Sequence, residues 1–234
     1  MTERKNRASI TGMKNILIIA DIAGEFDALM RLVAQVPEDT LKLSLGDMCD
    51  RGPKSKEVFE YFMGGPDRRA LQGNHEHMLL AYYEDIPCRM YEEGIWMWNG
   101  GDATLASYGE TDGFIPHDVR DWIKSLPLFY ETDDLFVSHA PWPHFLERQT
   151  DLSSIDVFEA VWNRAAPRDI GKLQVFGHNS HWGLRSYKRD DGVDYALCID
   201  QCRTKRVLTG YLWPEGKIIE VPFEGDQDAT DSAA

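Results

Sequence analysis

The charged turn Gly46–Pro53 combines the residue types and the spacing that metal or acid–base chemistry requires. Its carboxylates, Asp47 and Asp50, are three residues apart, and Arg51 follows the second one. Carboxylates crowded at a strand end are costly unless cations neutralise them, and one arginine cannot neutralise two. A metal ion on Asp47, with Asp50 and Arg51 left free for a substrate, would balance the charge. The alternative is a solvated loop whose aspartate caps the next helix.

Similar polar side chains follow other apolar runs of the chain. The complete set is Asp21, Asp47, Asp50, Arg51, Asn74, His75, His139 and His178. Oxygen and imidazole donors without thiolates suit Mn, Fe, Zn or Ni rather than an iron–sulfur cluster or a structural zinc site. Two metal ions about 3.5–4 Å apart share a ligand, and the Asp47 carboxylate suits that bridge because it has two oxygens. Asn74, His139 and His178 would then complete the ligands of one ion.

Strands predicted from the sequence place these side chains at strand ends. The runs 15–20 and 41–45 are apolar, as in strands buried on both faces, and 68–71 is a third candidate. Helical periodicity predicts helices over 25–35 and 53–63, and a further one follows His75. Three strand–loop–helix units predict an α/β sheet with crossover connections, whose chemistry gathers at the carboxyl ends of the strands.

The second half of the chain has a different pattern. Residues 84–125 predict a helical insertion without a strand. We expect a helix over 155–162 and, in a mostly antiparallel arrangement, strands over 128–130, 135–137, 173–176, 185–188, 195–199, 205–212 and 217–221. No repeat or low-complexity linker separates the halves. We therefore expect one domain with two sheets over 15–223, a flexible lead over 1–14 and an acidic, disordered tail over 224–234.

Composition limits the classes of function and location. The 234 residues carry a net charge of −14, which repels nucleic-acid backbones and anionic membranes, so we expect no DNA binding and no membrane association. No apolar run approaches the roughly 20 residues that span a bilayer, and the first residues lack a secretory pattern. Four scattered cysteines predict reduced thiols in a cytoplasmic protein. Any phosphate site must be made positive locally, by metals or arginines.

Five short motifs occur in order along the chain: Asp21-Ile-Ala-Gly, Gly46-Asp47-Met-Cys-Asp50-Arg51-Gly, Gly73-Asn74-His75-Glu, Ser138-His139-Ala and Gly177-His178. Together they resemble the signatures of calcineurin-like metallophosphoesterases. The likeness is to the phosphoprotein phosphatase branch, especially its compact bacterial and phage serine/threonine phosphatases; the bis(5′-nucleosyl)-tetraphosphatases are close relatives. One such motif is weak, whereas five in order are a strong signal.

The resemblance implies an α/β (α+β) fold, a four-layer αββα sandwich with two mixed β-sheets. It implies two divalent metal ions, Mn first with Fe, Zn or Ni as alternatives, between which a hydroxide attacks phosphorus directly. His75 would protonate the leaving group while Asp50 orients its ring, and Arg51 and Arg164 would grip the phosphate oxygens. The implied metal ligands are Asp21, Asp47, Asn74, His139 and His178.

The resemblance also implies the partner, a phosphorylated protein, peptide or small phosphoester, with phosphoserine and phosphothreonine as the first expectation. One alternative is hydrolysis of dinucleoside polyphosphates or capped nucleotide ends by the same metals. Another is a catalytically silent phosphate-binding module. The oligomeric state stays open.

One position departs from the family pattern. Ala23 stands where the Asp-x-His signature places a histidine ligand of the first metal. The substitution is engineered, or another residue such as His181 replaces the ligand, or the chain binds without catalysis. We favour a catalytic scaffold with a changed first-metal site. Asp200-Gln201-Cys202, where relatives often have Asp-Thr-Gly, predicts a different local turn.

Four aromatic side chains and a histidine lie outside the motifs. We expect Trp96, Trp98 and Trp122 to pack in the core, and His77 to lie on a helix surface. Trp142 follows His139 closely and is expected to edge the cleft, where an aromatic face would favour a nucleotide substrate.

Overall fold

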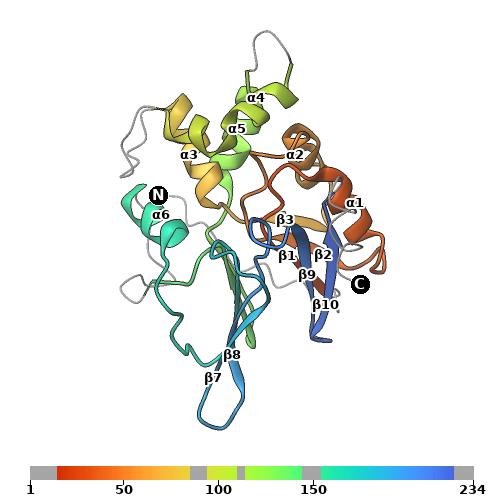
Figure 1. Cartoon of the computed structure of the whole chain (residues 1–234), viewed down its shortest axis with the longest axis vertical. Coiled ribbons are helices and arrows are strands. Elements are labelled where there is room, and N and C mark those ends of the chain that lie inside the picture. Colours follow the sequence, from red (N-terminus) through yellow and green to blue (C-terminus); the bar gives the residue numbers. More distant parts are fainter. Residues whose placement is uncertain (1–14, 85–93, 110–113, 144–153, 224–234) are drawn as a thin grey trace, which may run out of the picture.

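Two five-stranded mixed sheets face each other in the computed structural model, which describes residues 15–84, 94–109, 114–143 and 154–223. Figure 1 shows the arrangement. The first sheet has the order β10 (Lys217–Pro222), β9 (Val207–Trp213), β1 (Ile16–Ile19), β2 (Leu41–Ser44) and β3 (Arg68–Ala70). The second has the order β4 (Phe129–Glu131), β5 (Leu135–Ser138), β6 (Leu173–Phe176), β8 (Asp194–Cys198) and β7 (Arg185–Lys188).

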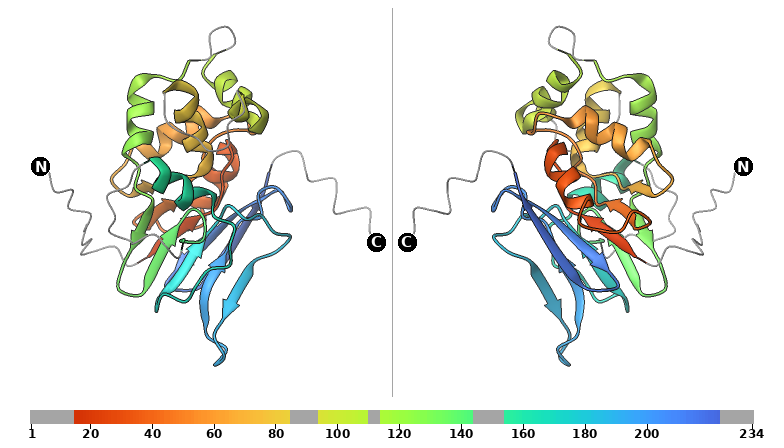
Figure 2. Two further views of the ribbon diagram at one scale, coloured as in Figure 1. Left: turned by 90° about the vertical axis from the view of Figure 1, so that its left-hand side faces the viewer. Right: turned by 90° about the vertical axis from the view of Figure 1, so that its right-hand side faces the viewer.

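Helices cover the outer faces of the sheets and complete a four-layer αββα sandwich, which confirms the expected fold. The first sheet is covered by α1 (Phe26–Val33), α2 (Ser55–Met63) and α3 (Asn74–Tyr83). The insertion adds η1 (Met97–Gly101), α4 (Asp102–Ser107) and α5 (His117–Ser125) beside them. On the second sheet, α6 (Ser154–Trp162) packs through Ala160 and Val161 against Phe136. Figure 2 shows these helices around the two sheets.

Strand β1 explains why the sheets lie face to face. Leu17 and Ile19 pack against the helices, whereas Ile16 and Ile18 pack against the second sheet. Because successive side chains of a strand point to opposite faces, an apolar run of this kind is stable only when both faces are covered. The buried run was correctly predicted.

Strand pairing in the second half differs from the sequence expectation. β9 and β10 complete the first sheet, with β9 antiparallel to β1, rather than joining the second. Within the second sheet β5, β6 and β8 run parallel, and only β4 and β7 are antiparallel to their neighbours. The pattern of one strand indicates its buried faces, but not its partner.

The described residues also bear on membrane association and on the state of the cysteines. None of their helices combines the length and apolar character needed to cross a membrane. Cys49, Cys198 and Cys202 are buried free thiols, while Cys88 lies outside the described residues. The expected 1–14 lead and 224–234 tail also lie outside them.

Candidate metal centre and active site

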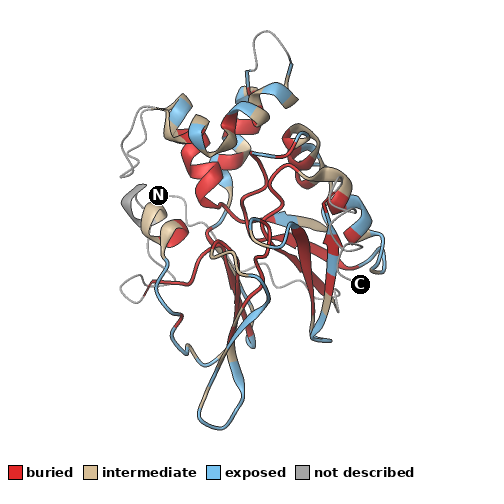
Figure 3. Cartoon of the chain, in the orientation of Figure 1, coloured by how far each residue is buried: buried red, intermediate tan, exposed pale blue. Residues whose placement is uncertain are grey.

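Strained turns at the strand ends carry the site. Among the described residues, six non-glycine residues have positive φ, and five of them lie in these turns: Ala23 (50°), Asp47 (48°), Asp50 (72°), Arg51 (67°) and His178 (64°). Left-handed backbone costs such residues roughly 1–2 kcal/mol each. The turns lie in the buried centre of the molecule, where the ends of the two sheets meet (Figure 3). Strain concentrated in this way is typical of functional sites.

Glu76 ties the Asp47 turn to the start of α3. Its carboxylate is fully buried and accepts hydrogen bonds of 2.8 Å from the backbone N–H groups of Asp47, Met48 and Gly73. Burial raises the pKa of Glu76 to about 7, and the neighbouring Asp47 charge adds to this effect. The hydrogen bonds of Glu76 to the turn were not predicted, because two of the three donors, Asp47 and Met48, lie in the turn after β2, far from Glu76 in the sequence.

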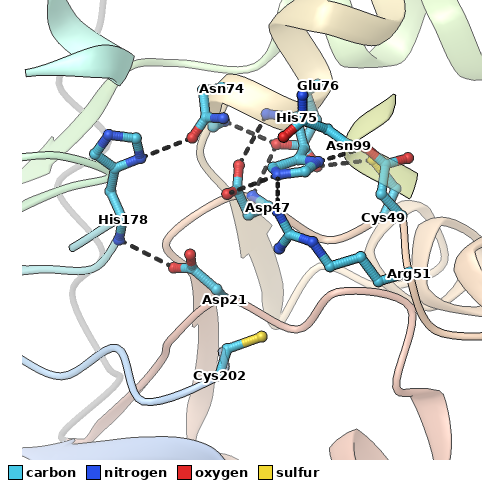
Figure 4. A network of polar contacts seen from close by, with 12 residues as sticks. Asp21, Asp47, Cys49, Arg51, Asn74, His75, Glu76, Asn99, His178 and Cys202 are labelled. Atoms are coloured by element: carbon cyan, nitrogen blue, oxygen red, sulfur yellow. Dashed lines mark hydrogen bonds and ion pairs between the residues drawn. The ribbon is translucent and has the colours of Figure 1, made fainter. Parts of the chain in front are cut away.

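Four side chains converge on one point, as Figure 4 partly shows. His139 Nε2 lies 3.0 Å from Asn74 Oδ1 and 3.5 Å from Asp47 Oδ1, and His178 Nδ1 lies 2.7 Å from the same Asn74 oxygen. Asp47, His139 and His178 form the candidate metal group among the described residues. We call Asp47, Asn74, His139 and His178 the histidine side of the site.

The donor chemistry of the histidine side fits a divalent cation. His139 donates Nδ1–H to the Leu45 carbonyl at 3.1 Å, which leaves the Nε2 lone pair facing the oxygens of Asn74 and Asp47. Acceptors facing acceptors in a buried site are unfavourable unless a cation lies between them. Two imidazoles, a carboxylate and an amide oxygen are ligands for first-row divalent metals.

Electrostatics favour the ligating protonation states on this side. Burial alone would raise the pKa of Asp47, but His139, His75 and His178 outweigh it and hold that pKa below its ordinary value. Burial lowers the pKa of His139, and it lowers that of His178 to about 2. Near neutral pH these shifts favour an ionised carboxylate and neutral rings of His139 and His178, as metal coordination requires; the charges of these two rings act on Asp47 only at acidic pH.

Asp21, Ala23 and Asp200 form the opposite part of the site, which we call the carboxylate side. Asp21 Oδ1 accepts from the His178 backbone N–H at 3.2 Å, and a Cβ at Gly177 would overlap this carboxylate. Burial, then Asp200, then Asp47 raise the pKa of Asp21 well above its ordinary value, and burial raises that of Asp200 to about 6. These carboxylates repel one another.

Ala23 contributes no ligand to the carboxylate side. Its methyl group is buried, and its backbone N–H donates to the Asp47 carbonyl at 2.9 Å. His181 is not part of the metal group found among the described residues; it is partly buried, and its pKa is lowered by burial and by Arg185. Asp200, which the sequence flagged only as an altered turn, is the carboxylate that acts most strongly on Asp21.

His75 lies between the Asp50 carboxylate and the Arg51 guanidinium. Its Nδ1–H donates to Asp50, and its Nε2 accepts from Arg51 Nη2 at 2.8 Å. Burial alone would lower the pKa of His75, but Asp47 and Asp50 outweigh it and raise that pKa. The raised pKa favours uptake of a proton at Nε2, which lies 3.8 Å from Asp47 Oδ2. The contact with Arg51 belongs to the neutral ring, because a protonated Nε2 donates and no longer accepts.

The helical insertion orients Asp50. Trp96 Nε1–H donates to the two Asp50 oxygens at 3.0 and 3.1 Å, and the Thr104 hydroxyl donates to Oδ1 at 2.6 Å. Trp96 does pack in the core, as expected, but its hydrogen bond to Asp50 was missed. Trp98 was expected in the core and is 71% exposed.

Two other expectations were wrong. Trp142 is buried against Phe129 and Phe136 rather than edging a cleft. His77 is buried rather than on a helix surface, because α3 is covered by α6 on that face, where the ring meets Phe158.

Arg164 lies at the mouth of the site. Its guanidinium is exposed, donates to Asn179 Oδ1 at 3.0 Å, and lowers the pKa values of His139 and His178 by its charge. It lines a polar cavity of about 310 Å³ together with His181 and Arg185.

Known proteins of similar sequence include phosphoesterases. A family model described as calcineurin-like phosphoesterase matches residues 14–209. A symmetrical bis(5′-nucleosyl)-tetraphosphatase from Vibrio vulnificus (strain CMCP6) is 32% identical over 128 residues, and one from Yersinia pestis (strain Pestoides F) is 45% identical over 130 residues. Each alignment covers 53% of this chain but only 43% and 40% of those relatives, so the chain matches less than half of their length.

Solved structures share the fold at low identity. A protein described as a candidate diadenosine tetraphosphatase superposes with a TM-score of 0.65 at 19% identity, covering 91% of this chain and 95% of its own. A protein serine/threonine phosphatase from Saccharomyces cerevisiae gives 0.53 at 15% identity, covering 89% and 79%. These similarities concern the fold.

Proposed function

The chain belongs to the calcineurin-like phosphoesterase family, and we propose that it hydrolyses phosphoesters with a divalent metal ion held by Asp47, Asn74, His139 and His178. The observation that carries this proposal is the convergence of two neutral imidazoles, a carboxylate and an amide oxygen on one buried point. When bound, the ion would supply Lewis-acid polarisation of a phosphoryl oxygen and an activated water molecule.

The surrounding residues have separate tasks. His75 gives a proton to the leaving oxygen from Nε2, while Asp50 keeps Nδ1 protonated and stabilises the charged ring. The raised pKa of His75 supports this role, because the protonated ring must be populated near neutral pH. Arg51 binds oxygens of the reacting phosphate, and Arg164, at the border with the neighbouring cavity, binds oxygens of the same or the adjoining phosphate; both offset, locally, the net charge of −14.

Metal content is proposed to be unequal on the two sides. The histidine side binds one ion tightly, and we propose Mn²⁺ because the donors mix oxygen and imidazole. The carboxylate side, with Asp21, the shared Asp47 and Asp200, binds a second ion weakly because Ala23 supplies no imidazole. This replaces the idea that His181 fills the gap.

We propose dinucleoside polyphosphates as the substrate class. The support is the name of the curated relatives, symmetrical bis(5′-nucleosyl)-tetraphosphatase, at 32% and 45% identity. Phosphoserine and phosphothreonine esters, the first expectation from the sequence, are the competing class. The chemistry on phosphorus is the same for both, so an assay must separate them.

The test is turnover by the purified chain after removal of metal with a chelator. Added Mn²⁺ should restore hydrolysis of diadenosine tetraphosphate and of p-nitrophenyl phosphate, with higher kcat/KM for the former than for a phosphoserine peptide. If neither substrate is cleaved with Mn²⁺, Fe²⁺, Zn²⁺ or Ni²⁺, the chain is a silent phosphate-binding module. A preference for the peptide would overturn the assigned substrate class.

A further inference from the structure

A positively charged cavity adjoins the metal centre. It has a volume of about 310 Å³ and is lined by the segment after α6, the loop after β6 and strand β7. Its lining residues include Arg164, Asn179, His181, Arg185 and Tyr187. Asn179 follows His178 directly, and the Arg164 charge acts on the rings of His139 and His178. The cavity therefore lies beside the histidine side.

The cavity arginines have no carboxylate partner among the described residues. Arg164 donates to the neutral Asn179 side chain at 3.0 Å, and the Arg185 guanidinium lies over the Tyr187 ring at 5.1 Å. Neighbouring cations are neutralised: Arg189 pairs with Asp169, and Lys188 pairs with Asp194 at 3.1 Å. In a chain with a net charge of −14, two unneutralised guanidinium groups facing one cavity favour an anionic ligand.

The size of the cavity limits what it holds. Small-molecule sites usually measure about 300–1,000 Å³, so a cavity of 310 Å³ takes part of a substrate rather than all of it. The metal centre would bind the phosphoryl group that reacts. The cavity would therefore bind the part of the substrate that extends beyond this group. Two forked donors match the closely spaced oxygens of further phosphate groups.

We propose that Arg185 and Arg164 form a subsite for the non-reacting phosphates of an oligophosphate substrate, which makes Arg185 a specificity determinant. This inference rests on the proposed function and names its substrate class more narrowly. Trp182 directly follows His181 and is 79% exposed, so it offers a face on which a nucleoside base can stack. The subsite adds affinity for a phosphate chain without taking part in bond cleavage.

The test compares Arg185→Gln with the matched control Arg189→Gln. Both remove one guanidinium from the hairpin formed by β7 and β8, but Arg189 is paired with Asp169 and is not a lining residue of the cavity. Calorimetric titration of inorganic tripolyphosphate into the full chain with Mn²⁺ should show affinity on the order of 10-fold weaker for Arg185→Gln, and within about 2-fold of wild type for Arg189→Gln.

Kinetics supply a second measurement. Arg185→Gln should raise KM for diadenosine tetraphosphate by a similar factor while kcat/KM for p-nitrophenyl phosphate stays unchanged. Trp182→Ala should weaken binding of the dinucleotide but not of tripolyphosphate. Arg185→Lys should recover only part of the loss, because an ammonium lacks the fork.

Three outcomes would overturn the subsite. The first is an equal loss of tripolyphosphate affinity in Arg185→Gln and Arg189→Gln. The second is an equal loss of kcat/KM for p-nitrophenyl phosphate and for diadenosine tetraphosphate in Arg185→Gln. The third is that Arg185→Gln changes activity toward acidic phosphopeptides alone. If wild type shows no turnover at all, the proposed function fails, yet the tripolyphosphate titration still decides whether the subsite exists.

Discussion

The two sides of the metal centre share Asp47 but differ in how their charge is balanced. On the histidine side, the imidazoles of His139 and His178 face Asp47 and help to lower its pKa. On the carboxylate side, Asp21 and Asp200 face each other without an imidazole, and the pKa of Asp21 is raised. The carboxylate side also contains Ala23, whose methyl group stands at the position where the family pattern has a histidine. The fold therefore brings side chains that can bind a metal ion together on the histidine side, whereas it brings mutually repelling carboxylates together on the carboxylate side.

The largest effect is expected when the histidine side loses a ligand. His139→Asn should weaken the tight Mn²⁺ site by at least about 100-fold, since even outer-shell partners of a metal contribute about 10–100-fold. Titration of Mn²⁺ into the chelator-treated chain measures this affinity. Asp21→Asn serves as the control and should leave the tight site intact. Equal losses in the two variants would remove the distinction between the sides.

His75→Asn separates proton transfer from metal binding. We expect kcat to fall by about 10²–10⁴-fold, because the leaving oxygen loses its proton donor, while Mn²⁺ affinity stays unchanged. The loss should be larger for an alkyl phosphate than for p-nitrophenyl phosphate, whose leaving group needs less protonation. A parallel drop in Mn²⁺ affinity would instead assign His75 to the histidine side as a ligand.

Ala23→His should strengthen the carboxylate side. Histidine is among the residues enriched at positive φ, so the backbone at 50° suits it better than most replacements. The metal ion on the carboxylate side should bind about 10–100-fold more tightly, which is the size of the change in metal affinity when a residue around a metal ligand is replaced. Turnover should rise as well. Metal analysis after dialysis should then give two ions per chain instead of one. An unchanged content of one would show that the missing ligand is not what limits this side.

Trp96→Phe should have the smallest effect. It keeps most of the buried ring but removes the donor to Asp50, and a hydrogen bond to a charged group contributes about 1.5–3 kcal/mol. We expect kcat to fall roughly 10-fold with unchanged Mn²⁺ affinity, and a lower free energy of unfolding in urea. Trp98→Phe, at an exposed position, is the matched control and should change neither quantity. Weaker Mn²⁺ binding in Trp96→Phe would connect the insertion to the histidine side.

The sequence by itself determined the fold class and the strand-end positions of the proposed site residues. Apolar runs such as 15–20, followed by helical periodicity, specify strand–loop–helix units, and such units place Asp21, Asp47 and Asn74 at one edge of a sheet. The β6 strand was also predicted with the bounds that the structure has, Leu173–Phe176. These features depend on local periodicity, which a single sequence contains.

Only the tertiary structure decided which side chains complete the site. Trp96 and Thr104 reach Asp50 from 46 and 54 residues away, and Glu76 reaches Met48 from 28 residues away. The influence of Asp200 on Asp21 depends on strand β8 pairing in parallel with β6, because Asp200 follows the end of β8 and so reaches the centre of the molecule from the second sheet. Contacts of this kind depend on how strands pair and helices pack, and no local pattern of residues records that choice.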